Sequence, residues 1–270
     1  MRRLLAFVPV VVGALAGCPA SFEGKVDGES VPTLVSAFFV QDQIDAGGGI
    51  TQFSVSASGV SALDACNGAT KLQENLNNAF DQKIKDDAAA NGAIADLQKS
   101  NATFVNAQVD FEKKSSPSDF WSVGIGVQSL DDKKIDGASV KVDIQQPPVI
   151  TDGPIGSVSI CRTNTFPIVK KDDDGTSRIV RDVDCFGSQK GSIDVGKWTK
   201  DGALEVTADI DLGKVRAAGI DPKDDSGSVK VKITAGWCET LEKALNDCKK
   251  LQTTANVPGC GATFVPAPPG

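Results

Sequence analysis

The chain has no histidine and no tyrosine, and its single methionine is the first residue. Without histidine it can form neither a Ser-His-Asp nor a Cys-His catalytic group, nor an HExxH zinc site. The commonest general base near neutral pH is also missing, so an enzyme would have to use carboxylates, Lys, Ser or Thr. The glycine-rich patterns GxxxxGK[ST] and GxGxxG are absent as well. We therefore expect no cofactor, and a non-catalytic protein is favoured over an enzyme.

The N-terminus has the layout of a secretory signal peptide, because Arg2 and Arg3 precede an apolar run over residues 4–16. The run is shorter than the roughly 20 residues that a membrane-spanning helix needs. It ends in Leu-Ala-Gly-Cys at positions 15–18, which resembles the lipobox of bacterial lipoproteins. The alternative is an ordinary signal peptide that leaves Cys18 as an unpaired thiol.

The lipoprotein resemblance implies that Cys18 is joined to a diacylglyceryl group and that residues 1–17 are then removed. The new amine is usually acylated, typically by a chain such as palmitate. Each buried CH₂ contributes about 0.8 kcal/mol, so two chains hold a protein firmly on a membrane. Residues 18–23 would be the lipidated cysteine and a short tether. We expect an exported protein of the bacterial cell envelope, at the outer membrane rather than the inner one.

The chain is acidic, with 28 Lys and Arg against 35 Asp and Glu. Removal of Arg2 and Arg3 with the signal peptide takes the net charge from −7 to −9. Such a surface repels nucleic acid, so no nucleic-acid partner is expected. The expected partners are the membrane, through the lipid on Cys18, and an envelope protein or glycan.

Seven cysteines are present, and assigning Cys18 to the lipid leaves an even number for disulfides, as is typical of exported proteins. The spacing contains no CxxC, which disfavours redox and zinc-ribbon sites. Cys161 and Cys185 flank the turn-forming stretch KKDDDG and are the preferred pair. The other candidates are Cys66, Cys238, Cys248 and Cys260, for which Cys66–Cys238 with Cys248–Cys260 is one plausible pairing among several.

Most of the chain alternates apolar and polar residues, which is typical of antiparallel strands with one face on a core. Turn-forming stretches such as DDKKIDG and DDSG separate these segments. The pattern predicts a mainly β fold, an antiparallel sandwich or open barrel, with two helical segments. The expected strands are 50–58, 102–112, 120–129, 137–145, 203–212 and 227–237.

The two expected helices are 69–99, which Asn91-Gly92 is positioned to divide, and 239–251. Cys248 falls on the apolar face of the second helix. The β-rich envelope domain is assigned to residues 24–264, with a proline-rich stretch at 145–154 that allows a subdivision. Residues 265–270 are expected to form a flexible tail.

Acidic residues and tryptophans are the weak candidates for binding sites. If the loop that follows 203–212 folds back over this strand, carboxylates of the strand and the loop could share a cation. These carboxylates are Asp209, Asp211, Asp221, Asp224 and Asp225. Trp121 and Trp237 lie in phase with core faces. Trp198, in the stretch VGKWTKDG, lies beside a hairpin turn and is the best candidate for an exposed aromatic that binds a ligand, although packing is the more common role.

These observations predict a lipid-anchored, non-catalytic binding or scaffolding protein of the cell envelope. Two alternatives stay open. One is a carboxylate-dependent hydrolase of envelope polysaccharide, which needs two carboxyl groups across a cleft with separated pKa values. The other is a Ca²⁺-dependent adhesion module.

Overall fold

The computed structural model describes residues 20–45, 51–61, 64–130, 140–144, 153–216, 219–220 and 225–255. Strands dominate these residues and three helices accompany them, which confirms a mainly β fold. The helices are α1 (Ala65–Ala90), α2 (Ile94–Ser115) and α3 (Glu239–Ala255). The strands are β1 (Ala20–Gly24), β2 (Ser36–Asp45), β3 (Thr51–Val60), β4 (Phe120–Ser129), β5 (Val140–Ile144), β6 (Ile155–Thr163), β7 (Ile168–Lys171), β8 (Ser177–Val180), β9 (Val183–Val195), β10 (Ala203–Arg216), β11 (Gly219–Ile220) and β12 (Gly227–Trp237).

Most strands form one mixed sheet that closes into a barrel. Antiparallel pairs follow the order β2, β3, β4, β6, β9, β10 and β12. β12 then returns to β2 through a short parallel contact that pairs Gly236 with Phe38 and Trp237 with Phe39. β1 pairs with the first half of β12, and β5 pairs with the second half of β9. β4 and β6, on either side of the stretch 145–154, pair directly, so the barrel draws strands from both sides of it.

The barrel core is built from the alternation seen in the sequence. In β10, even-numbered residues from Leu204 to Leu212 are buried and the odd-numbered residues between them are exposed. Ile233 of β12 and Phe39 of β2 reach the same core and are fully buried. Burying one such side chain contributes about 1.5–3 kcal/mol to stability. The alternation therefore fixes which face of each strand points inward, and burial of these faces favours closure of the barrel.

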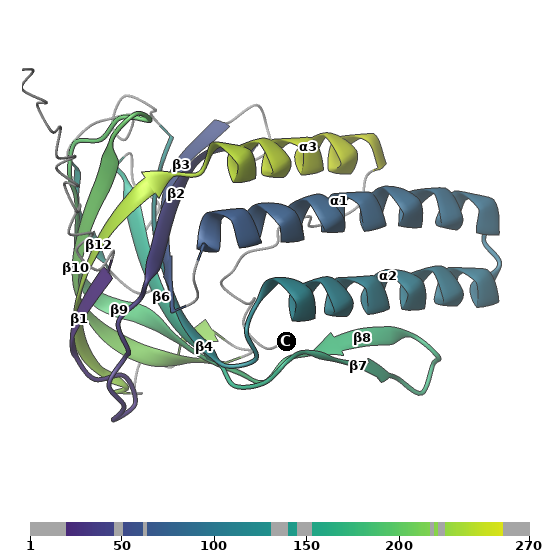
Figure 1. Ribbon diagram of the computed structural model, residues 1–270, viewed down its shortest axis with the longest axis horizontal. Coiled ribbons are helices and arrows are strands. Elements are labelled where there is room, and N and C mark those ends of the chain that lie inside the picture. Colours follow the sequence, from purple (N-terminus) through teal and green to yellow (C-terminus); the bar gives the residue numbers. More distant parts are fainter. Residues whose placement is uncertain are drawn as a thin grey trace, which may run out of the picture.

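The three helices form an arm that projects from one side of the barrel (Figure 1). α1 lies between α3 and α2, and the β7–β8 hairpin lies along α2. Leu72, Leu76 and Phe80 of α1 recur every four residues and are buried. A smaller apolar cluster, which includes Phe38 and Leu241, joins the base of the arm to the barrel.

The turn at the tip of the arm divides the helix that the sequence predicts over 69–99. Asn91 has φ 46° and its backbone N–H donates to the Ala88 carbonyl. Gly92 follows with φ 83°, a conformation that favours glycine. Two residues in the left-handed region end α1 and reverse the chain into α2.

Two sequence-based expectations are wrong, and two strands were missed. Residues 102–112, predicted as a strand, lie inside α2. α2 contacts α1 on one side and β8 on another, so it has two apolar stripes, and these blur the helical period. The predicted tether includes residues 20–23, which form part of β1 instead. β6 and β9 were not predicted, because their polar and glycine residues hide the alternation.

Candidate functional site

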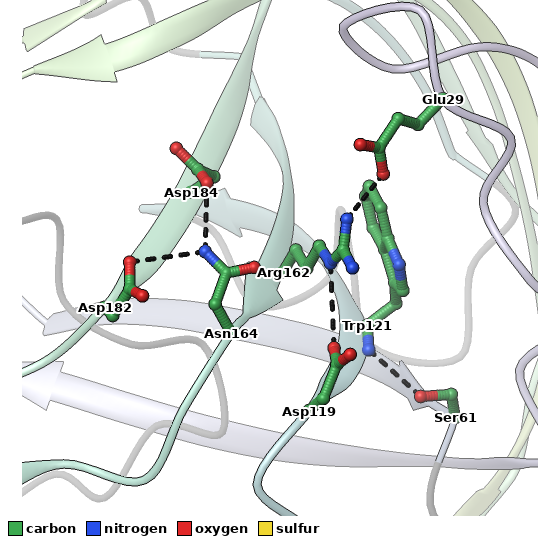
Figure 2. Close-up of polar contacts among 8 residues, drawn as sticks. All are labelled: Glu29, Ser61, Asp119, Trp121, Arg162, Asn164, Asp182 and Asp184. Carbon is green, nitrogen blue, oxygen red and sulfur yellow. Dashed lines mark hydrogen bonds and ion pairs between the residues drawn. The ribbon is translucent and has the colours of Figure 1, made fainter.

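A cluster of charged residues lies at the end of the barrel where β4, β6 and β9 meet (Figure 2). Trp121 of β4 pairs with Arg162 of β6, and Arg162 pairs with Asp184 of β9. Residues that pair across neighbouring strands point to the same face, so these three side chains lie in a row. The backbone N–H of Trp121 donates to the Ser61 hydroxyl at 3.0 Å.

Arg162 is held by two carboxylates and an aromatic ring. Its Nη1 donates to Glu29 Oε2 at 2.6 Å, and its Nε lies 3.6 Å from Asp119 Oδ1. The guanidinium stands 5.8 Å from the centre of the Trp121 ring, within the range of a cation–π contact. Glu29 belongs to the segment between β1 and β2, so this cluster ties that segment to the barrel.

A second charge pair lies beside the first. Lys214 Nζ is 2.7 Å from Asp184 Oδ1, and the Asn164 amide donates to Asp184 at 3.1 Å and to Asp182 at 3.3 Å. The hydrogen bond from Lys214 is the main cause that lowers the pKa of Asp184. Asp184 in turn raises the pKa of Lys214. Arg162 and Lys214 are each paired with a carboxylate, so the cluster is suited to holding chain segments together.

Glu242 forms a comparable network where the arm meets the barrel. Its Oε2 accepts hydrogen bonds from the Gln41 backbone N–H at 3.2 Å and from Trp237 Nε1 at 2.8 Å. Its Oε1 pairs with Lys200 Nζ at 2.9 Å, and Lys200 also lies 4.3 Å from the centre of the Trp237 ring. Burial acts to raise the pKa of Glu242, but these bonds outweigh it and lower the pKa.

Two of the expected disulfides are present in the described residues. Cys161 and Cys185 are paired residues on β6 and β9, with Cα atoms 4.2 Å apart. Cys66 in the first turn of α1 joins Cys238, directly before α3, with Cα atoms 5.8 Å apart. Cys248 is fully buried, as predicted from its helix face, and is also disulfide-bonded. Cys260, its expected partner, lies outside the described residues, as does Cys18.

The acidic candidates do not converge within the described residues. Asp209 lies on the exposed face of β10, 3.6 Å from Lys230 Nζ. Asp211 accepts a hydrogen bond from the Ser228 hydroxyl, and Asp225 accepts one from the Gly227 N–H. Asp221 and Asp224 lie outside the described residues. The part of the chain that the structure describes contains no group of three side chains suited to a metal ion.

Trp198 is buried and packs in the core, the role that the sequence favoured over an exposed binding aromatic. Its side chain is only 5 % exposed and belongs to the barrel core. It packs edge-on against Phe39, with ring centres 5.2 Å apart. Position along the chain suggested a surface turn, but the ring folds inward because it is large and apolar.

A groove of about 280 Å³ between α1 and α2 was missed by the sequence reasoning. Its apolar wall includes Phe104, Phe111, Ala79 and Ala107. Phe104 also meets Phe80 of α1 edge-on, with ring centres 5.9 Å apart. The seven-residue spacing of Phe104 and Phe111 is a helical signal, and the assignment of 102–112 to a strand concealed it.

Comparison with known proteins finds no matching family model, no matching curated protein and no matching solved structure. Among the described helices, none combines the length and the apolar character that crossing a bilayer requires.

Proposed function

We propose that this chain is a lipid-anchored protein of the bacterial cell envelope, at the outer membrane, that binds or scaffolds a partner through its helical arm. The observation that carries the proposal is the arm itself, which extends away from the barrel and carries an apolar groove between α1 and α2. Concave apolar surfaces with a polar rim are typical binding sites. Asn75, Asn78 and Gln82 supply that rim.

The base of the arm is held rigidly, which suits a binding surface. The Cys66–Cys238 disulfide joins the starts of two helices, and Glu242 bonds α3 to both β2 and β12. A surface that is ordered before binding loses less conformational entropy when a partner arrives. The arm can therefore act as a preformed platform.

The position of β1 supports an anchor that leaves the arm accessible. β1 begins at Ala20, two residues after Cys18, a distance of at most about 7 Å. Figure 1 places β1 on the side of the barrel opposite the tip of the arm. Lipid on Cys18 would hold the β1 side of the barrel at the membrane, with the arm extending from the other side.

The catalytic alternative receives less support from the described carboxylates. A glycoside hydrolase needs a carboxyl group with a raised pKa as its general acid. Hydrogen bonds lower the pKa values of five described carboxyl groups, which is opposite to what a general acid needs; they are Asp87, Asp174, Asp184, Glu242 and Asp247.

Site-specific photo-cross-linking in intact cells tests the proposal. A cross-linking amino acid replaces Thr103, an exposed residue at the groove, or Thr234, an exposed residue on β12 as the matched control. We expect a discrete envelope-protein adduct from Thr103 and none from Thr234. Absence of any adduct from Thr103 contradicts the proposal. Incorporation of labelled lipid into the Cys18→Ala variant contradicts it as well, because the anchor is then not on Cys18.

A further inference from the structure

One face of α2 carries a regular seam of residues. Its members are spaced alternately by four and three positions, the spacing of residues through which two helices pack against each other. The middle of the seam is small and uncharged, and both ends are charged. The members are Asp96, Ser100, Thr103, Ala107, Asp110 and Lys114.

The seam borders the groove between α1 and α2. Thr103 and Ala107 line the groove together with the half-buried rings of Phe104 and Phe111, and Ser100, which also lines it, is itself buried. Small side chains allow the backbone of a second helix to approach, and the rings beside them provide apolar surface. The face is therefore shaped to receive another helix.

The charges are arranged so that the seam complements itself. An antiparallel copy centred between Thr103 and Ala107 places Asp96 opposite Lys114 of that copy. The same arrangement brings Lys99, which neighbours the seam, next to Asp110 of the copy. A two-fold axis repeats each contact, so both ends of the seam gain opposite charges. A parallel copy would place like charges together instead.

We propose that this face binds a second copy of the chain, with α2 packed antiparallel against α2 of that copy. α1 lines the groove face with the uncharged Asn75, Asn78 and Gln82, followed by Lys83 and Asp86. The dimer names the partner of the proposed binding surface, so it rests on the arm being that surface, but it does not depend on the lipid anchor.

The size of the face predicts a reversible dimer. α2 has 22 residues and is therefore about 33 Å long. Two adjacent helices present a strip about 20 Å wide, which gives roughly 600 Å² per copy, near the lower end of specific interfaces. The two barrels lie at opposite ends of the paired arms.

Sedimentation of the lipid-free chain, residues 18–270 with Cys18→Ser, tests the dimer. We expect a monomer–dimer equilibrium over protein concentrations of about 1–200 μM, as suits an interface of this size. Lys114→Glu replaces two attractive contacts by two repulsive ones and should weaken the dimer about tenfold or more. Lys113→Glu, an exposed neighbour outside the seam, is the matched control and should have little effect.

Charge exchange gives the sharper result. Asp96→Lys alone should also weaken the dimer, but a mixture of Asp96→Lys and Lys114→Glu chains should form heterodimers, because both contacts become attractive again. A chain that stays monomeric at every concentration, or a dimer that Lys114→Glu weakens no more than Lys113→Glu, overturns the inference. A Thr103 adduct with a different protein, from a chain that is monomeric when purified, overturns the dimer and leaves the proposed function standing.

Discussion

Replacing Glu242 by Gln should loosen the joint between arm and barrel. The carboxylate accepts hydrogen bonds from β2 and β12 on one oxygen and pairs with Lys200 on the other. Its side chain is 18 % exposed, so water replaces these partners poorly. Gln can keep one acceptor for Gln41 and Trp237, but its amide NH₂ then faces the Lys200 ammonium.

The expected cost follows from the type of bond. Hydrogen bonds to charged groups contribute about 1.5–3 kcal/mol and neutral ones about 0.5–1.5 kcal/mol. Removing the buried charge offsets part of the lost hydrogen-bond stabilisation, because burying a carboxylate costs free energy. Lys200 stays 39 % exposed and can be hydrated, so no orphaned buried charge remains. The free energy of unfolding should fall by about 1–2 kcal/mol at pH 7.

The cost should depend on pH with a defined sign. The folded pKa of Glu242 is lowered below its ordinary 4.5. The stabilisation is therefore fully present above pH 4.5 and is lost as the pH falls through the folded pKa. Since Glu242→Gln does not titrate at this position, the difference in stability between the two proteins should shrink from pH 7 to about pH 3.

Urea denaturation followed by tryptophan fluorescence measures this difference, because Trp237 contacts the substituted group. Glu239→Gln is the matched control, as Glu239 is an exposed glutamate in the same first turn of α3. The reasoning is refuted if Glu242→Gln is no less stable than Glu239→Gln at pH 7, or if its deficit is the same at both pH values.

Three further predictions concern the barrel and the disulfide at the arm base. Replacing both Cys66 and Cys238 by Ala opens a loop of sequence separation 172 and should lower the free energy of unfolding by about 2–5 kcal/mol, measured in urea against the unsubstituted, disulfide-bonded chain. Trp198→Ala should cost about 3–5 kcal/mol by calorimetry, because it opens a cavity beside the barrel core, and a loss below 1 kcal/mol would contradict its buried position. Arg162→Gln should cost only about 0–1 kcal/mol and mainly at low salt, since the Arg162 and Glu29 side chains are partly exposed; an equal loss in 1 M salt would argue against an ionic cause.

Local patterns predicted much of the fold. The alternation in 120–129, 203–212 and 227–237 identifies strands that the structure contains, because each has one face on the core. Asn91-Gly92 marked the break between α1 and α2 correctly. The pattern failed for 102–112, where two neighbours bury two stripes of one helix and imitate alternation.

The candidate site was less predictable, because its residues lie far apart along the chain. Arg162, Glu29 and Asp119 come from three separate parts of the chain, and each alone resembles a solvated charge. Glu242 gains its partners only when β2 and β12 meet beside α3. No short-range spacing encodes these contacts, so a reading of the sequence could not find them.

The amino-acid sequence by itself determined the strand-rich character, the lack of histidine chemistry and the pairing preference of Cys161 with Cys185, because these depend on composition and on residues close along the chain. Only the tertiary structure decided that the sheet closes through β12 and β2, that Trp198 turns inward, and that α1 and α2 enclose a groove. Those features depend on which distant segments bury each other's apolar surface, and that free energy is not carried by any local pattern.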